Sequence, residues 1–262
     1  MDIIQTLAQQ LNLTAEQVGK TVQLIDEGNT IPFIARYRKE VTGSLDDSVL
    51  RTLDEKLTAL RNLAQRKQEV QDLIGAQGKL TAEVRAAIER AATVTEVDDI
   101  YRPFRPKRKT RASVARERGL EDLAILLFAQ EKSYAPSIEE QAARFVDPER
   151  EVPDVAAALQ GAMDIVAEEV SDNADYRREL RRLTFDAGSL TSKAAKEEDS
   201  VYAMYYDFSE PLRKLPGHRI LAINRGEKEE FLKVALTVPE DVVLGYPVSY
   251  THLRAHETCA DL

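Results

Sequence analysis

The sequence predicts an all-α fold, in which a multi-helix N-terminal region is followed by a small α/β segment. The 262 residues include only 11 Gly and 10 Pro, so residues that break helices are scarce. Apolar residues make up 43% of the chain, which is enough for a real core at this length. Many of them recur three and four residues apart, the spacing that places side chains on one face of a helix.

The N-terminal signals mark where the first helices begin. Thr14 and Gln17 have the spacing of a capping box, and they precede an apolar face that ends at Gly28. The residue before Pro32 is expected to leave the helical region of backbone conformation, so the chain is predicted to restart there. A short helix with a cationic last turn is then predicted over Phe33–Lys39.

Further stretches carry the same helical spacing. Asp154 is predicted to cap one of these helices, and Pro103 and Pro106 are predicted to hold the chain extended between two others. The predicted helices are Ser48–Ile74, a segment from Thr81 to Ile88, Thr95–Tyr101, Leu120–Ala129, Ser137–Val146, Asp154–Val170 and Asp175–Phe185.

The domain organisation follows from changes in composition. Residues 1–187 are predicted to form one helical domain, and the polar stretch 188–200 is interpreted as a linker. Residues 201–247 are interpreted as the start of a central α/β region, with a short helix near Arg219–Arg225 and a strand at Phe231–Val238. Residues 248–262 are set apart as a non-native tail.

Charge and cysteine content indicate the compartment and limit the partners. The net charge of −9 argues against a protein that coats nucleic acid through its overall field, so such contact requires a local basic patch. The single cysteine, Cys259, excludes an internal disulfide framework and indicates a reducing compartment. No secretory signal is visible, and the longest apolar run, Leu123–Ala129, is too short to cross a bilayer. We expect a soluble cytoplasmic protein without a membrane partner.

The residues needed for catalysis are sparse, so we predict that the protein is not an enzyme. His218 is the only histidine before residue 252, which leaves little for a Cys–His or Ser–His nucleophile, and no glycine-rich phosphate loop occurs. We therefore predict no cofactor, no metal and no small-molecule substrate. Adjacent acids on a helix point about 100° apart and are interpreted as solvated faces. The acid pairs are Asp46–Asp47, Asp98–Asp99, Glu168–Glu169 and Glu197–Glu198.

One stretch departs from the acidic average. The segment Tyr101–Arg118 contains eight Lys or Arg residues and a single acid, Glu117, and two aromatic rings lie among the charges. Arginine binds phosphate through its planar fork, and an aromatic ring can stack on an unpaired base. The alternative is that these cations pair with the chain's own acids, such as the run Glu96–Asp99, or with a partner protein. The candidates for nucleic-acid contact are Tyr101, Arg102, Phe104, Arg105, Lys107, Arg108, Lys109 and Arg111.

A second cationic cluster lies on the predicted helix Asp175–Phe185. Its members are four residues apart in pairs, so each pair shares a face of the helix. A solvated helix face is the alternative interpretation. The cluster consists of Arg177, Arg178, Arg181 and Arg182.

Four long strings resemble one protein family. They are IPFIARYRKEVTGSLDD (31–47), VDDIYRPFRPKRKTRASVARERGLEDLA (97–124), DVAAALQGAMDIVAEEVSDNADYR (154–177) and LPGHRILAINRGEKEEFLKV (215–234). In this order they resemble the N-terminal part of the Tex family of bacterial transcription accessory proteins, which are distantly similar to a eukaryotic transcription elongation factor. The resemblance runs from residue 1 to about Gly245.

The resemblance implies a helical N-terminal region with a helix-turn-helix-like portion. In the family a ribonuclease-H-like domain, helix-hairpin-helix units and a terminal S1 domain follow, and the S1 domain is credited with nucleic-acid binding. The family is regarded as lacking a demonstrated nuclease activity. The residues that match the family strings, none with an implied catalytic role, are Arg36, Tyr37, Arg38, Lys39, Tyr101, Arg102, Pro103, Arg105, Lys107, Arg108, His218, Arg219, Arg225 and Gly226.

The segment after residue 247 does not share the family pattern. It holds His252, His256 and Cys259, whose spacing on a helix would allow a zinc site. Its amino-acid sequence is more typical of a translated adapter, so we expect an unpacked tail.

These observations predict a nucleic-acid-associated transcription accessory protein that binds RNA or DNA weakly and without sequence preference. The alternative is a protein-interaction scaffold that contacts transcription or ribosome components, which its amphipathic helices and acidic charge favour. A metal-dependent nuclease is the third hypothesis, and only the acid pairs suggest it.

Overall fold

The computed structural model describes residues 2–106, 108–129, 137–196 and 198–250. The chain divides into two compact units, Met1–Arg105 and Pro106–Leu262. The division therefore falls within the basic segment, well before the linker expected at 188–200. No described helix is both long enough and apolar enough to cross a membrane.

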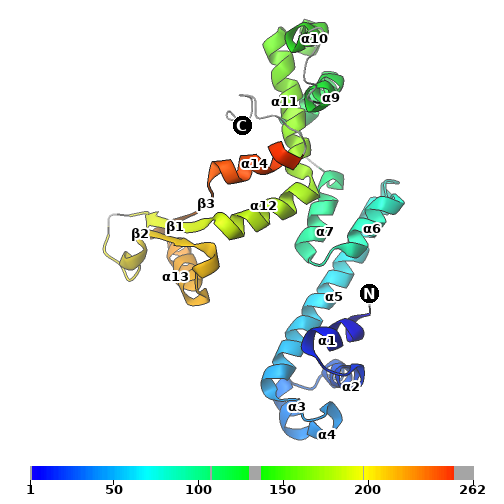
Figure 1. Ribbon diagram of the computed structural model, residues 1–262, viewed down its shortest axis with the longest axis vertical. Coiled ribbons are helices and arrows are strands. Elements are labelled where there is room, and N and C mark those ends of the chain that lie inside the picture. Colours follow the sequence, from blue (N-terminus) through cyan, green and yellow to red (C-terminus); the bar gives the residue numbers. More distant parts are fainter. Residues whose placement is uncertain (1, 107, 130–136, 197, 251–262) are drawn as a thin grey trace. The chain divides into compact units, whose positions relative to one another are not determined.

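The first unit is helical, as the sequence predicts (Figure 1). A helix is present at each predicted stretch, and α3 begins at Ile31, two residues before the predicted start. Pro32 lies in the first turn of α3, where the absence of its N–H costs no helical hydrogen bond. The elements are α1 (Ile3–Leu11), α2 (Ala15–Asp26), α3 (Ile31–Tyr37), α4 (Lys39–Thr42), α5 (Asp47–Ala76), α6 (Ala82–Arg90), α7 (Val94–Tyr101) and the 3-10 turn η1 (Arg102–Phe104).

Side chains cap the starts of these helices. Thr14 and Gln17 form the predicted capping box at α2, in which each side chain bonds the backbone of the other residue. Asp46 accepts a hydrogen bond from Val49 N at the start of α5, and this bond holds the pKa of the Asp46 carboxyl below its usual value. Between α2 and α3 the chain turns within four residues, with Gly28 at a φ of 86°. Such a short turn fits the expected helix-turn-helix-like portion.

Helix α5 contributes buried side chains to three apolar clusters of the first unit. Near its start, Leu53 and Leu57 are buried against α1 and α2, and Leu50 is buried in a cluster with residues of α2 and α3. Near its end, Val70 and Ile74 are buried against α6 and α7. The single helix therefore joins the two clusters near its start to the one near its end.

The second unit continues the helical pattern and adds a small sheet before its last helix (Figure 1). Its helices are α8 (Arg111–Glu117), α9 (Glu121–Ala129), α10 (Ile138–Ala142), α11 (Val155–Asp172), α12 (Ala174–Ala187), α13 (Gly217–Lys228) and α14 (Glu240–Tyr250), with 3-10 turns η2 (Ala143–Phe145), η3 (Pro148–Arg150), η4 (Ala203–Tyr205) and η5 (Leu212–Lys214). Its strands are β1 (Ser189–Ala194), β2 (Asp207–Pro211) and β3 (Leu232–Thr237).

The helical part of this unit packs around α11. Asp154 caps α11 as predicted, since its side chain accepts a hydrogen bond from Ala157 N at 2.8 Å. At Gly161 the helix passes very close to the segment that joins α8 and α9, because a Cβ there would lie 2.4 Å from Leu120 Cδ1. Leu120 is 1% exposed and belongs to the core that α8, α9 and α11 share. This close approach fixes how α8 and its cations lie along α11.

The sheet corrects the interpretation of 188–200 as a linker. The strand order is β2-β1-β3, both pairings are antiparallel, and β1 is therefore the central strand. Leu190 of β1 pairs with Leu236 of β3. Ser192 is buried, and its hydroxyl is satisfied because it donates to Tyr205 O at 2.7 Å. The predicted strand at 231–238 is confirmed as β3, and the predicted helix near Arg219 is confirmed as α13.

Candidate nucleic-acid interface

The aromatic residues of the basic segment lie in or against a core. Tyr101 ends α7 and is 7% exposed, and the guanidinium carbons of Arg66 and Arg105 lie 5.8 and 5.7 Å from its ring centroid. Phe104 is half-buried and packs against the same core. The structure thus corrects the expectation that these rings are open to an unpaired base. It also shows that Asp98, in the acidic run considered as a partner for these cations, pairs with Arg66 at 2.7 Å.

The expected extended path through the segment is also wrong. Residues 102–104 form η1 and residues 111–117 form α8, so both ends of the segment are helical. Pro103 lies in the first turn of η1, a position that proline tolerates. The candidates Arg102 and Arg105 are exposed at the end of the first unit. Lys107 lies outside the described residues.

Three exposed cations begin the second unit. Lys109 Nζ lies 3.3 Å from Glu117 Oε2, and both side chains are more than half exposed. Arg111 Nη2 lies 3.4 Å from Asp164 Oδ1, and the Arg111 side chain is 78% exposed. Arg108 is exposed and forms no ion pair with another described residue. We call Arg108, Lys109 and Arg111 the α8 cluster.

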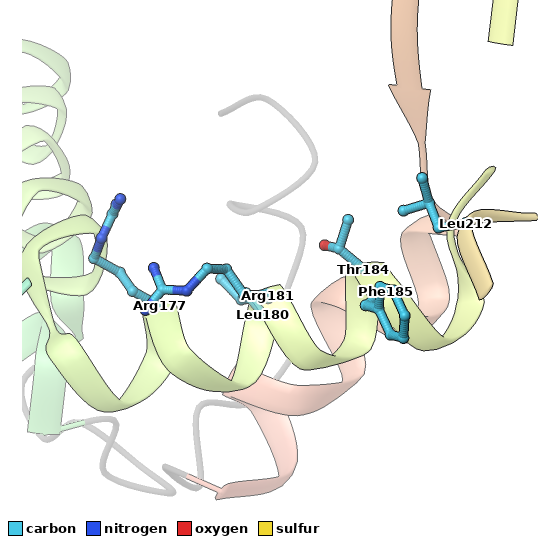
Figure 2. A pocket seen from close by; sticks show the side chains of 6 residues that line it. All are labelled: Arg177, Leu180, Arg181, Thr184, Phe185 and Leu212. Atoms are coloured by element: carbon cyan, nitrogen blue, oxygen red, sulfur yellow. The ribbon is translucent and has the colours of Figure 1, made fainter. Parts of the chain in front are cut away.

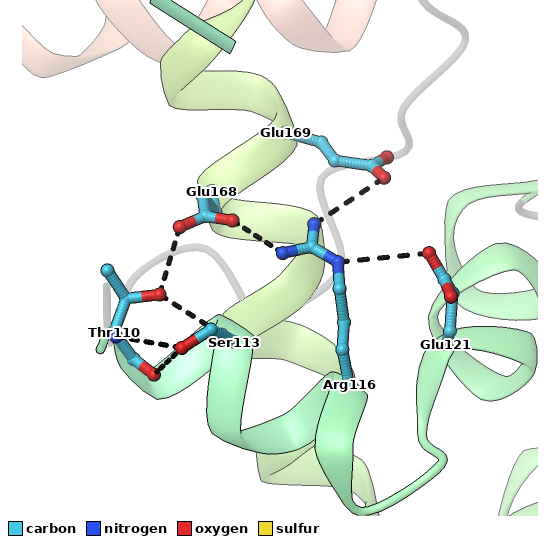
Figure 3. A network of polar contacts seen from close by, with 6 residues as sticks. All are labelled: Thr110, Ser113, Arg116, Glu121, Glu168 and Glu169. Atoms are coloured by element: carbon cyan, nitrogen blue, oxygen red, sulfur yellow. Dashed lines mark hydrogen bonds and ion pairs between the residues drawn. The ribbon is translucent and has the colours of Figure 1, made fainter. Parts of the chain in front are cut away.

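The remaining cations of the segment are held by acids of the same unit, as Figure 3 shows for Arg116. Arg116 Nη1 donates to Glu168 Oε2 at 2.6 Å, and Glu169 and Glu121 lie 3.9 and 3.8 Å from the same guanidinium. Thr110 Oγ1 donates to the other oxygen of Glu168 at 3.1 Å. These contacts tie the start and the end of α8 to α11.

Arg118 is bound in a similar way. Its Nη2 lies 2.5 Å from Glu151 Oε2, and this hydrogen bond holds the pKa of the Glu151 carboxyl below its usual value. Its Nε is buried and has no hydrogen-bond partner among the described residues. Together with Lys109 and Arg111 it lines a groove of about 470 Å³ between α8 and α11, and Gly161 is among the lining residues. At this groove, residues of the basic segment line a cavity.

The second cationic cluster is balanced by its own helix. On α12, Arg178 pairs with Asp175 at 2.8 Å, and Arg182 pairs with Glu179 and with Asp186. The hydrogen bond from Arg182 holds the pKa of Glu179 below its usual value.

The other two arginines of that cluster border a groove on α12. Arg177 donates to the backbone oxygen of Ser171 at 3.3 Å, and Arg181 also has a partner. Figure 2 shows both beside a groove of about 390 Å³ whose wall includes the exposed ring of Phe185. This face is therefore mixed in character, and apolar atoms form much of it.

Two family models match the chain. The Tex-like protein N-terminal domain matches residues 1–75, and the Tex central region-like model matches residues 133–258. The chain belongs to the Tex family. The second match runs to residue 258, so the family pattern continues past residue 247, where we expected it to stop. The candidate zinc ligands His252, His256 and Cys259 lie outside the described residues.

The chain is also similar to several longer proteins. It is 43% identical over 243 residues to "Protein tex" of Bordetella pertussis and 38% identical over 259 residues to "Transcriptional accessory protein Tex" of Neisseria gonorrhoeae. It is 29% identical over 249 residues to human "S1 RNA-binding domain-containing protein 1". These matches cover 92%, 97% and 92% of the Tex chain, but only 30%, 34% and 25% of the relatives. The chain thus spans about a third of the length of its bacterial relatives.

The Tex chain also exposes a cationic group that the sequence argument did not select. Arg36, Arg38 and Lys39 lie on α3 and at the start of α4, and the rings of Phe33 and Tyr37 are exposed beside them. A signal was present, because residues 28–39 contain these cations and no acid. It was overlooked because the segment 101–118 is longer and richer in Lys and Arg.

No group of metal-binding side chains occurs among the described residues of the Tex chain. The acid pairs of the sequence analysis mostly serve as partners of cations. Asp47 pairs with Arg51 at 2.6 Å, and Glu168 binds Arg116 and Thr110. Such acids take part in ion pairs and hydrogen bonds within the fold.

Proposed function

We propose that this chain is the helical module of a transcription accessory protein and that it contacts RNA or DNA weakly, without sequence preference. The observation that supports the contact is the α8 cluster, in which Arg108, Lys109 and Arg111 are exposed and the last two line the groove between α8 and α11. The relatives named as transcriptional accessory and S1 RNA-binding proteins support the cellular role.

The strengths of the ion pairs decide which cations are available. Exposed pairs contribute about 0–1 kcal/mol, so Lys109 gives up little when phosphate replaces the Glu117 carboxylate. Arg111 is 78% exposed and lies 3.4 Å from the largely buried carboxylate of Asp164, so its outer face is open to a phosphate while that pair is kept. Arg116 is more deeply buried and makes a short charge-assisted bond to Glu168, so it remains structural. With few available cations on a chain of net charge −9, the binding is weak.

The test is fluorescence anisotropy of a labelled single-stranded RNA or DNA titrated with the chain at several salt concentrations. Replacing Arg108, Lys109 and Arg111 together by Ala is expected to weaken binding and to lower the slope of log K against log salt by about 0.7 for each lost phosphate contact. The matched control removes three exposed cations elsewhere in the same unit. That control is Lys193→Ala, Lys228→Ala and Lys233→Ala.

Two results would contradict this proposal. One is an absence of binding by the unmodified chain even at low salt. The other is an equal loss of affinity in the control variant, because the effect would then follow net charge and not the α8 cluster. The proposal includes no catalytic step, so cleavage product above that of a mock preparation in a metal-dependent assay would also contradict it.

A protein-interaction scaffold is the second candidate function, and one observation favours it. The groove on α12 presents Leu180, Phe185 and Leu212, and Phe185 is 56% exposed (Figure 2). Large exposed rings at a groove are typical of interaction surfaces. Transcription or ribosome components should then be recovered with the chain after nuclease treatment and lost with Phe185→Asp. Met204→Asp, at another exposed apolar position, is the control; equal losses in both variants would argue against the groove.

A further inference from the structure

Helix α3 presents two aromatic rings to solvent. Ile34 anchors the helix because its side chain is completely buried in a cluster with Leu50 of α5. Phe33 and Tyr37 are four residues apart, so they share one face of α3. Their ring centroids lie 5.2 Å apart with the planes tilted by 45°, and Tyr37 is 62% exposed. Phe33 thus supports one side of a ring that is otherwise open.

Cations without acidic partners neighbour these rings in the chain. The guanidinium carbon of Arg38 lies 5.4 Å from the Phe33 centroid, and its Nη1 donates to the backbone oxygen of Tyr37 at 3.4 Å. Arg36 and Lys39 are exposed, and neither forms an ion pair with another described residue. Glu40 is the one acid in the adjoining α4, and it too forms no such pair.

This arrangement differs from that of the arginines on α8 and α12. On α8 and α12 most of the arginines are matched by acids of the same unit, whereas Arg36, Arg38 and Lys39 keep their charge uncompensated on an acidic chain. An exposed ring beside unpaired cations is complementary to a polyanion whose flat groups are accessible. Single-stranded nucleic acid offers both, since every base has a face on which a ring can stack. A duplex conceals those faces, and an acidic peptide lacks them.

We infer that α3 is a single-strand binding surface, on which Tyr37 stacks against an unpaired base while Arg36 and Lys39 contact the flanking phosphates. Phe33 and Arg38 hold the Tyr37 ring in place and contribute their own apolar and cationic surface. The α3 surface belongs to the first unit, whereas the α8 cluster belongs to the second. It goes beyond the proposed function and does not depend on the α8 cluster.

The experiment uses the whole chain with the α8 cluster already replaced by Ala. The probe is a labelled oligouridylate of about 12 nucleotides, within the range of single-strand binding sites. Tyr37→Ala is expected to weaken binding about 5- to 150-fold, the range that loss of one base stack produces. Tyr37→Phe keeps the ring and should stay within about twofold.

The phosphate contacts are tested separately by salt dependence. Replacing Arg36, Arg38 and Lys39 together by Ala should lower the slope of log K against log salt by about 1.4, or roughly 0.7 for each of the two phosphate contacts assigned to Arg36 and Lys39. The matched control in the same unit, Lys79→Ala, Arg85→Ala and Arg90→Ala, should leave the slope nearly unchanged. Circular dichroism should show unaltered helix content throughout, since these side chains are exposed.

Several outcomes would overturn the inference. Unchanged affinity in Tyr37→Ala, or an equal loss in the control variant, would exclude α3 as the surface. Equal affinity for a duplex of the same length would exclude stacking, and tighter binding of polyglutamate that also depends on Tyr37 would assign the surface to an acidic protein. Complete loss of binding when only the α8 cluster is replaced would overturn this inference and leave the proposed function intact. Full retention of binding in that variant would contradict the proposed role of the α8 cluster and leave this inference intact.

Discussion

Gly161 offers a direct test of how the second unit is packed. A Gly-to-Ala change inside a helix usually stabilises it by about 1 kcal/mol. At this position the new Cβ would lie 2.4 Å from Leu120 Cδ1 and 3.4 Å from Ala115 Cβ. Because Leu120 is fully enclosed in the core, its methyl group cannot move freely, and overpacking of this kind costs about 1–3 kcal/mol. We therefore expect Gly161→Ala to destabilise the protein by about 1 kcal/mol net.

A matched substitution supplies the control. Gly19 lies inside α2, and a Cβ there would meet only Ile4 Cδ1 at 3.9 Å, an ordinary contact. Gly19→Ala should therefore stabilise its unit by about 0.5–1 kcal/mol. Differential scanning calorimetry measures both effects, since about 1 kcal/mol moves the melting temperature by about 2–4 °C in a domain of this size. The two substitutions should shift it in opposite directions.

A double variant identifies the cause. Leu120→Ala alone should cost about 2–5 kcal/mol because it leaves a cavity. In that background the new Cβ has room, so adding Gly161→Ala should become neutral or stabilising. The steric explanation is refuted if Gly161→Ala stabilises the unmodified protein, or if its effect is the same with and without Leu120.

Three further predictions concern polar contacts. The Arg61 hydrogen bonds hold the pKa of Asp26 below its usual 3.8. This exposed pair therefore contributes about 0.2–1 kcal/mol near neutral pH and loses that contribution as the pH falls through the lowered pKa. In urea unfolding, Asp26→Asn should lower the free energy of unfolding at neutral pH, and the difference from the unmodified protein should vanish in acid. Arg116→Ala should lower the free energy of unfolding by about 1.5–3 kcal/mol, and by much less when Glu168→Gln is already present. A double-mutant cycle measures this, and additive losses would show that Arg116 and Glu168 are not coupled. Asp154→Ala should cost about 1 kcal/mol by removing the α11 cap, and Asp154→Asn should recover most of it in thermal melts.

The features that sequence predicted well are local ones. The capping box at Thr14 and the cap at Asp154 depend on residues three positions apart, so the spacing alone identifies them. The long helix α5 was equally clear because its apolar residues repeat over many turns. Such patterns predict the all-α fold with a small α/β segment, and the structure confirms it.

The features that sequence predicted poorly depend on distant partners. Strand β1 was interpreted as a linker because it is polar, yet Ser192 is buried with its hydroxyl satisfied by Tyr205, and β3 pairs with it from about forty residues away. Counting charges in 101–118 likewise gave no indication of which would be paired. Glu151 and Glu168, which bind Arg118 and Arg116, come much later in the chain.

The way α5 divides its side chains has a practical consequence. The N-terminal family match ends at residue 75, yet Val70 and Ile74 are enclosed by α6 and α7, which come later in the chain. A fragment trimmed at that boundary would display these side chains to water on the last turns of a helix about 45 Å long. The segment that the N-terminal family model matches is therefore shorter than the segment that must fold together. Expression fragments of this region should therefore extend through η1.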